Sequence, residues 1–249
     1  MPSLDADVLL LAAGFGTRLK PLTDSTPKPL LEIDGRCLIE FALDLCVRSG
    51  ARRVLVNLHY LGDRIRQRLG DGSSYGLRIE YAEEPVILDT GGAIKNIEGL
   101  LLHDRLIVLN SDTIFGPGLM LDELVEAHLL HSDKPAITAV VRQDPQSADY
   151  GELGLDTKNR LVSFLGKQYS TVSAVQKTMF AGAHVLERSV ITAMPPRGSI
   201  FSVTRDTWAG LLAAGETICG YHFDGYWSDV GTPERFFAAS KEVPLIFPR

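Results

Sequence analysis

The sequence contains little cysteine, and its cysteines are scattered. Only Cys37, Cys46 and Cys219 occur in 249 residues, and no two of them form a C-x-x-C pair. This sparse and odd set excludes a scaffold held together by disulfides and gives no support to a zinc knuckle. It is typical of buried thiols in a reducing compartment.

Long apolar runs and an excess of positive charge are also missing. No apolar stretch approaches the roughly 20 residues of a transmembrane helix. The run Val8–Ala13 follows Asp5 and Asp7 and not a basic segment, so we interpret it as a buried strand rather than a signal peptide, and we expect a cytoplasmic protein. With 25 Lys and Arg against 31 Asp and Glu, the net charge is −6. This argues against a nucleic-acid partner, and the lack of a long apolar run argues against a membrane.

What is present is an ordinary globular composition, in which apolar runs alternate with amphipathic segments. This alternation predicts an α/β fold with a mostly parallel, doubly wound sheet. In the first half we expect strands at 8–13, 53–58, 77–81, 105–109 and 136–141, and helices at 38–47, 61–69, 92–101 and around 121–129.

The second half has shorter strand candidates and fewer helices, so we expect it to extend the sheet with a small antiparallel piece. The expected strands are 151–155, 161–165, 178–185, 217–223 and 227–230, and the expected helices are 203–214 and 234–240. The polar, Ser-rich segment 166–174 is expected to be a mobile loop.

The most informative segment reads LAAGFGTRLKPLT and is followed by TPKPL. A strand that runs into a glycine-rich turn brings backbone N–H groups close to a bound phosphate. Gly14 and Gly16 permit the positive φ angles of such a turn, and Arg18 and Lys28 supply positive charge. The alternative is a tight turn without a ligand. A Rossmann fingerprint is excluded because Leu19 stands where the third glycine is needed, and no Walker A motif is present.

The full run GFGTRLKPLTDSTPKPL resembles the signature of the sugar-1-phosphate nucleotidyltransferases, or NDP-sugar pyrophosphorylases. The resemblance covers about residues 6–240. It implies a Rossmann-like nucleotidyltransferase fold and the reaction NTP + sugar 1-phosphate → NDP-sugar + pyrophosphate. Among short, single-domain members, the chain is similar to the N-acetylmuramate 1-phosphate uridylyltransferases and the mannose or heptose 1-phosphate guanylyltransferases.

The resemblance also implies which part of the chain binds which substrate. Longer members append a β-helix or regulatory domain, for which 249 residues leave no room. We therefore expect one nucleotidyltransferase domain over 1–249, with 6–145 mainly binding the nucleotide and 146–240 mainly binding the sugar phosphate. The expected nucleotide-binding residues of the glycine-rich segment are Ala12, Ala13, Gly14, Gly16 and Thr17.

Arg18 and Lys28 are the catalytic residues that the resemblance implies. They would neutralise charge on the reacting phosphates. The attacking oxygen belongs to the sugar phosphate, whose second pKa is about 6, so it is already anionic and needs no general base. The six histidines fall in no catalytic constellation, and we interpret them as surface or core residues.

Two aspartates match family motifs that hold Mg²⁺, the expected cofactor. Asp112 ends the run LIVLNSD, and Asp229 lies in YWSDVGTP. Mg²⁺ is usually held by one or two carboxylates together with substrate phosphates and water. Taken alone, Asp112 is better explained as a helix N-cap or a turn residue, and Asp229 as a turn residue; the glycine-rich segment is what favours the metal role.

The run EEPVILDTGGA resembles the family's base-recognition loop, which makes Glu84, Thr90, Gly91 and Gly92 further nucleotide-binding residues. Many members carry Gln in place of Glu84. A carboxylate accepts hydrogen bonds from guanine or uracil alike, so UTP and GTP both remain candidates. Asp89 stands where Gly is more common, and a similar acidic-Thr-Gly-Gly run occurs in the N-acetylmuramate enzymes. Helix-start geometry alone is the alternative interpretation of the two glycines.

The runs YGELG (150–154), FLGK (164–167) and FAG (180–182) resemble the segments that hold the sugar phosphate. They make Gly151, Glu152, Lys167 and Gly182 the expected sugar-phosphate ligands. Gly166 and Phe180 replace the usual Glu and Asn, which argues against a standard glucose pocket and towards a lactyl-bearing or manno-type sugar.

Two other functions remain open at this stage. One is a catalytically silent homologue that binds sugar nucleotides and acts in regulation. The other is a cytidylyltransferase, or a related enzyme, acting on a phosphate that is not a sugar phosphate. The retained charged residues argue against the first, and WSDVGTPE argues against the second. The expected partners are an NTP and a sugar 1-phosphate, and the chain is expected to be a monomer or a homodimer.

Overall fold

The computed structural model of the chain describes residues 4–145 and 151–248. The chain divides into two compact units. Unit 1 consists of Met1–Ile87, Val108–Leu121 and Gly225–Arg249, and unit 2 consists of Leu88–Ile107 and Asp122–Asp224. Unit 1 is therefore built from segments that are far apart in the sequence.

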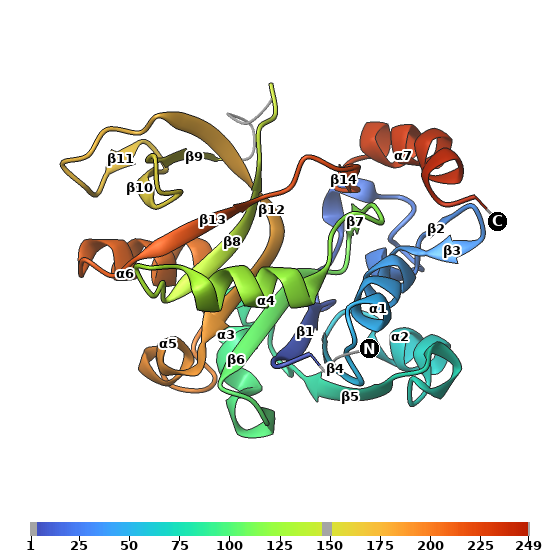
Figure 1. The fold of residues 1–249 in the computed structure, drawn as a ribbon. Coiled ribbons are helices and arrows are strands. Elements are labelled where there is room, and N and C mark those ends of the chain that lie inside the picture. The colour runs from blue at the N-terminus through green and yellow to red at the C-terminus, as the bar shows by residue number, and fades with distance from the viewer. Residues whose placement is uncertain (1–3, 146–150, 249) are drawn as a thin grey trace. The chain divides into compact units, whose positions relative to one another are not determined.

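Parallel strands form the centre of unit 1 (Figure 1): β1 (Asp7–Leu11), β4 (Arg53–Leu58) and β5 (Arg78–Glu83). β4 pairs in parallel with both β1 and β5. Almost every residue of β1 and β4 is buried, as expected for apolar runs that are covered on both faces of a sheet. These strands confirm the expected α/β alternation, although β1 ends before Ala12.

The other elements of unit 1 are helices and short antiparallel pairs. They are α1 (Leu38–Arg48), α2 (Gly62–Leu69), α7 (Pro233–Ile246), β2 (Glu32–Ile33) with β3 (Arg36–Cys37), and β7 (Thr113–Phe115) with β14 (Trp227–Asp229). β6 (Arg105–Asn110) and α4 (Leu121–Leu130) each contain a position at which the chain changes unit.

Helix α7 is longer than the sequence indicates, because its second half is held by packing. Thr232 caps the helix and Pro233 occupies its first turn. The helix then continues past the predicted end at Ser240 and through Pro244. Val243, which is 2% exposed, lies in the core of unit 1, and tertiary packing of this kind stabilises a helix more than local propensity does.

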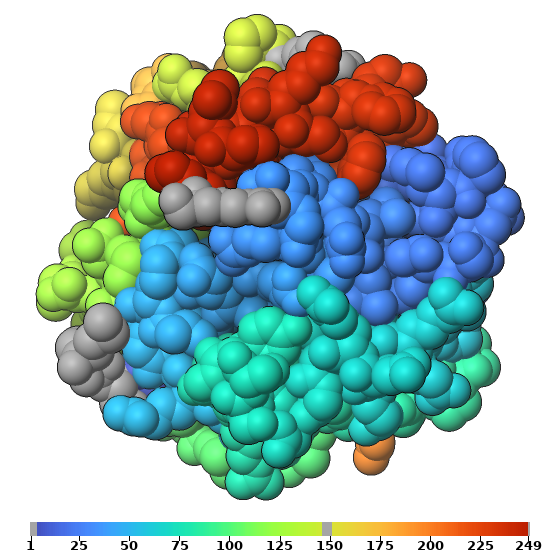
Figure 2. Space-filling model, turned by 90° about the vertical axis from the view of Figure 1, so that its right-hand side faces the viewer, coloured from blue at the N-terminus to red at the C-terminus, as the bar shows by residue number. Residues whose placement is uncertain are grey.

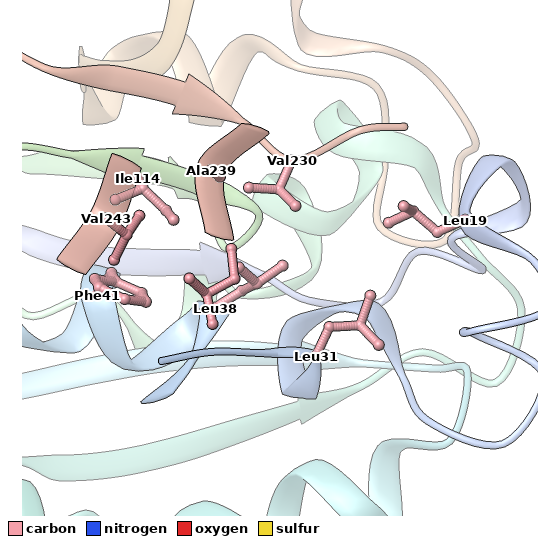
Figure 3. Close-up of a cluster of buried hydrophobic side chains, with 9 residues drawn as sticks. Leu19, Leu31, Leu38, Phe41, Ile114, Val230, Ala239 and Val243 are labelled. Atoms are coloured by element: carbon pink, nitrogen blue, oxygen red, sulfur yellow. The ribbon is translucent and has the colours of Figure 1, made fainter. Parts of the chain in front are cut away.

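The core around α7 joins the two ends of the sequence. Figure 3 shows Ala239 and Val243 of α7 facing Leu38, Phe41 and Ile114. Figure 2 shows the C-terminal segment, in red, lying directly on the N-terminal segment, in blue. Burial of these apolar side chains therefore fixes the C-terminal segment onto the N-terminal part of unit 1.

Unit 2 contains a mixed sheet in which most neighbours are antiparallel. Its strands are β8 (Ile137–Arg142), β9 (Glu152–Leu155), β10 (Leu161–Phe164), β11 (Lys167–Gln168), β12 (Gln176–Glu187) and β13 (Ile218–His222). β12 is antiparallel to β8 and β9, β10 is antiparallel to β9 and β11, and β13 is parallel to β8. The expected antiparallel piece is confirmed.

The prediction of a mobile loop at 166–174 is wrong for its first residues, because Lys167 and Gln168 form a strand, β11. Leu165 and Gly166 both have positive φ angles, 50° and 73°, which turn the chain tightly enough for β11 to pair with β10. Tyr169 continues the contact, because its N–H donates to the carbonyl of Val162 (2.8 Å).

The helices of unit 2 also depart from the expected bounds. They are α3 (Asp89–Asn96), α5 (Arg188–Ala193) and α6 (Ala209–Ala213), the last preceded by a π-helical turn at Val203–Trp208. α3 begins before the expected residue 92 because the carbonyl of Phe201 accepts hydrogen bonds from the N–H groups of Gly91 (2.9 Å) and Gly92 (3.2 Å). These donors of the first turn have no partner inside the helix.

A buried histidine lies in the core of unit 2. His184 is 2% exposed, and its ring centroid lies 5.5 Å from that of Phe180 and 5.7 Å from that of Trp208. Within the described residues, neither ring nitrogen of His184 has a hydrogen-bond partner. Burial lowers the pKa of His184 from 6.5 to about 3, because a charged imidazolium is poorly solvated there.

We therefore expect the free energy of unfolding to decrease as the pH falls from 6.5 to 5. In this range the unfolded histidine binds a proton and the folded one does not, so the unfolded state is favoured by about 1–2 kcal/mol. The measurement is denaturant unfolding at both pH values, for the wild type and for His184→Leu. Equal pH dependence in the two proteins would contradict the expectation.

Candidate active site

The segment after β1 folds back so that Gly16 lies against Lys28. Gly16 has a φ of 62°, and its carbonyl accepts hydrogen bonds from Leu19 N and Thr23 Oγ1, both at 2.9 Å. A Cβ atom at Gly16 would lie 2.9 Å from Thr23 Cγ2 and 3.1 Å from Lys28 Cβ. The expected need for glycine at this position is thus explained by both conformation and space.

The other glycine of this segment behaves differently from the prediction. Gly14 does not have a positive φ, so the expectation that it needs one is wrong. A Cβ atom there would meet nothing within 4 Å, so this position faces open space. Ala12 and Ala13, which precede it, are buried, whereas Thr17 is exposed.

Lys28 is directed at Asp112. It lies in the 3₁₀ turn Lys28–Leu30, is 8% exposed, and donates a hydrogen bond from Nζ to Asp112 Oδ2. Asp112 follows β6, and the preceding residue, Ser111, donates from Oγ to the carbonyl of Leu11 (2.6 Å). The end of β1 and the start of β7 are thereby held together beside the ammonium group.

Asp229 is brought to the same place by the pairing of β14 with β7 (Figure 1). It is the last residue of β14 and stands opposite Thr113, which follows Asp112. The N–H of Val230 donates to the carbonyl of Asp112 (3.0 Å). Two carboxylates from distant parts of the sequence therefore lie on neighbouring segments of unit 1.

The two arginines near Asp229 complete a cluster of opposite charges. Arg235, in the first turn of α7, donates from Nη1 to Asp229 Oδ2 (2.8 Å). Arg18 Nη2 and both carboxylate oxygens of Asp229 lie 3.0–3.2 Å from where a Cβ atom of Gly231 would be. The guanidinium group of Arg18 and the carboxylate of Asp229 are therefore close neighbours. Burial, followed by the charge of Asp112, raises the pKa of Asp229, while Lys28, Arg235 and Arg18 oppose the rise.

This donor set fits a divalent cation that is shared with a substrate. Burial is the main cause of the raised pKa at Asp229, and the charge of Asp112 adds to it, so the two carboxylates repel each other. A cation between them would relieve that repulsion. Lys28 and Arg235 each donate to an Oδ2 atom, and Thr113 Oγ1 lies 3.5 Å from Asp112 Oδ1. Among the described residues there is no group of three or more acidic, His or Cys side chains arranged for a metal. A Mg²⁺ ion held by Asp112 and Asp229 would therefore need phosphate and water oxygens as well.

Glu84 is held at the end of β5, also within unit 1. It is 3% exposed, and its Oε1 accepts a hydrogen bond from Asn57 Nδ2 (2.7 Å). Asn57 Oδ1 in turn accepts the N–H of Ala12 (2.7 Å). One amide side chain therefore links the expected phosphate-binding segment to the expected base-binding carboxylate.

Thr90, Gly91 and Gly92 lie at the start of α3, in unit 2. Thr90 Oγ1 accepts the N–H of Val203 (2.9 Å). A Cβ atom at Gly91 would lie 2.4 Å from the ring of Phe201, and one at Gly92 would lie 2.3 Å from the carbonyl oxygen of Ser199. These glycines thus permit close packing of α3 on residues 199–203, which supports a structural role for the pair.

We expect Gly92→Ala to lower the free energy of unfolding by about 1–3 kcal/mol. The new methyl group would collide with the backbone at Ser199, which has no rotamer by which to withdraw. The measurement is denaturant unfolding. Gly99→Ala is the matched control, because a Cβ atom at Gly99 meets nothing within 4 Å. A Gly92→Ala protein as stable as the control would contradict the packing argument.

The expected sugar-phosphate residues all lie in unit 2. Glu152 pairs with Lys177 (3.1 Å), and Lys167 Nζ lies 4.8 Å from the centroid of the Tyr169 ring. Gly151 and Gly182 have φ angles of 85° and 91°. Glu152 and Lys167 thus have partners of their own within unit 2. Tyr150, in the same sequence motif, lies outside the described residues.

Sequence reasoning missed Arg235 and Asn57. Arg235 is separated from Asp229 by a turn and a helix cap, so its approach depends on how α7 begins. A basic residue six positions after the WSD aspartate was the available signal. Asn57 resembles an ordinary polar residue at a strand end, and no local signal indicates that it bridges two loops.

Comparisons with known proteins give the family. Residues 7–244 match the family described as "Nucleotidyl transferase". An N-acetylmuramate alpha-1-phosphate uridylyltransferase from Caulobacter vibrioides is 31% identical over 241 residues, which cover 94% of this chain and 96% of that protein. The chain belongs to the nucleotidyl transferase family. The resemblance carried by GFGTRLKPLTDSTPKPL is confirmed.

Another relative is longer than this chain. A mannose-1-phosphate guanylyltransferase from Mycobacterium tuberculosis is 35% identical over 244 residues, or 98% of this chain but 66% of that protein. The chain thus spans slightly less than two thirds of that relative. The crystal structure of HddC from Yersinia pseudotuberculosis complexed with GMP-PN has a TM-score of 0.78 at 24% identity, with 96% of this chain and 99% of that chain covered. The α/β nucleotidyltransferase fold is thereby confirmed.

None of the described helices of this nucleotidyl transferase family member has the length and apolar character needed to span a bilayer.

Proposed function

We propose that the protein transfers a nucleotidyl group from an NTP to a sugar 1-phosphate, giving an NDP-sugar and pyrophosphate. The observation that carries this proposal is the cluster of Arg18, Lys28 and Arg235 around Asp112 and Asp229 in unit 1. Cations beside a carboxylate pair suit a reaction whose reactants are all anionic. Membership of the nucleotidyl transferase family supports the same conclusion.

The proposed chemistry needs charge neutralisation and alignment rather than a general base. An oxygen of the sugar phosphate attacks the α-phosphorus of the NTP and forms a new P–O bond. The bond from the α-phosphorus to the bridging oxygen breaks, and its electron pair leaves with pyrophosphate. Arg18 and Lys28 would stabilise the negative charge on these groups. Mg²⁺, held by Asp112 and Asp229, would polarise phosphate oxygens when bound.

We propose two binding regions for the two substrates. The nucleotide would be bound mainly by residues 6–145, through the segment from Ala12 to Thr17 for the phosphates and through Glu84 and Thr90–Gly92 for the base. The sugar phosphate would be bound mainly by residues 146–240, and the side chains proposed there are Glu152 and Lys167, next to the glycines Gly151 and Gly182.

Two of the three candidate substrate pairs are supported by the names of relatives, and the third by the sequence resemblance. UTP with N-acetylmuramate 1-phosphate is supported by the name of the Caulobacter relative, and GTP with mannose 1-phosphate by that of the mycobacterial one. GTP with a heptose 1-phosphate is the third pair. Gly166 and Phe180, which replace the usual Glu and Asn, argue for these sugars over glucose.

A pyrophosphate-release screen tests the proposal. UTP, GTP, CTP and dTTP are each combined with N-acetylmuramate, mannose, heptose and glucose 1-phosphates, with Mg²⁺ and with EDTA. We expect release with UTP or GTP and one of the first three sugars, and loss of release in EDTA. Failure of every pair to release pyrophosphate would overturn the proposed reaction.

A further inference from the structure

Asn57 lies near the end of β4 and is 3% exposed, and its side-chain orientation is fixed by its two partners. The N–H of Ala12 is a donor only, so the atom that it reaches at 2.7 Å is the amide oxygen, Oδ1. The other end of the amide is therefore Nδ2, a donor, and it lies 2.7 Å from Glu84 Oε1. Asn57 thus obliges the side chain of residue 84 to accept a hydrogen bond at that atom.

The backbone of Glu84 is also fixed by neighbouring residues. Its N–H donates to the carbonyl of Leu58 (2.8 Å), and its carbonyl oxygen lies 2.7 Å from His59 Nδ1. An ionised carboxylate is only an acceptor and has about four lone-pair sites. One hydrogen bond from Asn57 therefore orients the group without exhausting its capacity to accept others.

We propose that Asn57 is a positioning residue that holds Glu84 as a hydrogen-bond acceptor, so that the pair selects bases with a ring N–H donor on the Watson–Crick edge, guanine first. Guanine presents two adjacent donors, N1–H and the N2 amino group. Uracil presents one, N3–H, between two carbonyl oxygens. Cytosine and adenine have an amino donor, but the ring nitrogen beside it is an acceptor, which a carboxylate repels. This inference rests on the proposed function, because it takes Glu84 as the residue that contacts the base.

Exchanging the donor and acceptor roles in the hydrogen bond between residues 57 and 84 tests this inference. In Glu84→Gln, Asn57 still donates, so the introduced glutamine must accept through its oxygen and turn its amino group towards the base. We expect the ratio of kcat/KM for GTP over CTP to fall by about tenfold or more. In the double variant Asn57→Asp/Glu84→Gln, the introduced aspartate accepts from the amino group of the introduced glutamine, whose oxygen then faces the base. We expect the preference for GTP to return towards the wild-type value.

The rescue separates positioning from a merely structural role. Loss of packing at Asn57 would lower activity with all nucleotides and would not restore a base preference. Glu83→Gln is the matched control, since its side chain lies in an exposed ion pair with Arg66, and we expect its base preference to equal that of the wild type. The melting temperature of each variant reports whether it is folded.

Equilibrium binding of GTP, UTP, CTP and ATP without sugar phosphate completes the test. If the wild type binds nucleotides with the expected preference but releases no pyrophosphate, the inference stands and the proposed reaction fails. If the wild type turns over but Glu84→Gln keeps its base preference, the inference is overturned. The inference is also overturned if Glu84→Gln and Asn57→Asp/Glu84→Gln have the same base preference.

Discussion

Replacing Lys28 by alanine is expected to lower kcat/KM for pyrophosphate release by on the order of 10³-fold. Lys28 is 8% exposed and is held beside Asp112 by the turn Lys28–Leu30, so its ammonium group is preorganised where anionic phosphates would meet. Water that fills the space left by the side chain cannot replace a fixed positive charge. The measurement is the initial rate of pyrophosphate release at limiting NTP.

Lys20→Ala is the control for this variant. Lys20 belongs to the same segment but forms an exposed ion pair with Asp24 (3.3 Å). Exposed pairs contribute little, so we expect this variant to keep nearly all of the activity. Circular dichroism and melting curves show whether Lys28→Ala is folded. A folded Lys28→Ala protein with normal turnover would refute the role of this lysine.

Asp112→Asn is expected to lower the maximal rate by about 10²-fold and to raise the Mg²⁺ concentration that gives half of it. Asparagine has nearly the same shape and still accepts the hydrogen bond from Lys28. It lacks the negative charge that, with Asp229, would bind the metal ion. The measurement is a Mg²⁺ titration of the initial rate at saturating substrates.

The matched control for Asp112→Asn is Asp24→Asn, which changes an exposed aspartate of the same unit. We expect its Mg²⁺ titration to match that of the wild type. If Asp112→Asn lost activity but its Mg²⁺ titration were unchanged, the aspartate would act by orienting Lys28 and not by binding the metal.

Much of the fold was predictable because each local signal had one strong physical cause. The buried apolar runs gave β4 at its observed bounds and β1 within two residues of its end. The helix expected from residue 234 gave the start of α7 within one residue. The starts of α3 and β11 were not predictable, since they depend on the carbonyl of Phe201 and on positive φ angles at Leu165 and Gly166.

The candidate site was predictable in its charged residues and not in the contacts that orient them. Arg18, Lys28, Asp112 and Asp229 belong to sequence motifs, and the structure brings them together within unit 1. The position of Arg235 depends on tertiary contacts between distant segments, as does the repulsion between the two aspartates. Residues that orient others carry no motif of their own, because many side chains can fill that role.

The way in which unit 1 is assembled has a consequence for its synthesis on the ribosome. Leu38 and Phe41 emerge early, whereas Val230, Ala239 and Val243, which cover them, are translated near the end. At elongation rates of about 5–20 residues per second, these early side chains remain uncovered for on the order of ten seconds or longer. The nascent protein therefore exposes an aggregation-prone apolar surface during translation. Chaperones that bind such surfaces have this interval in which to act.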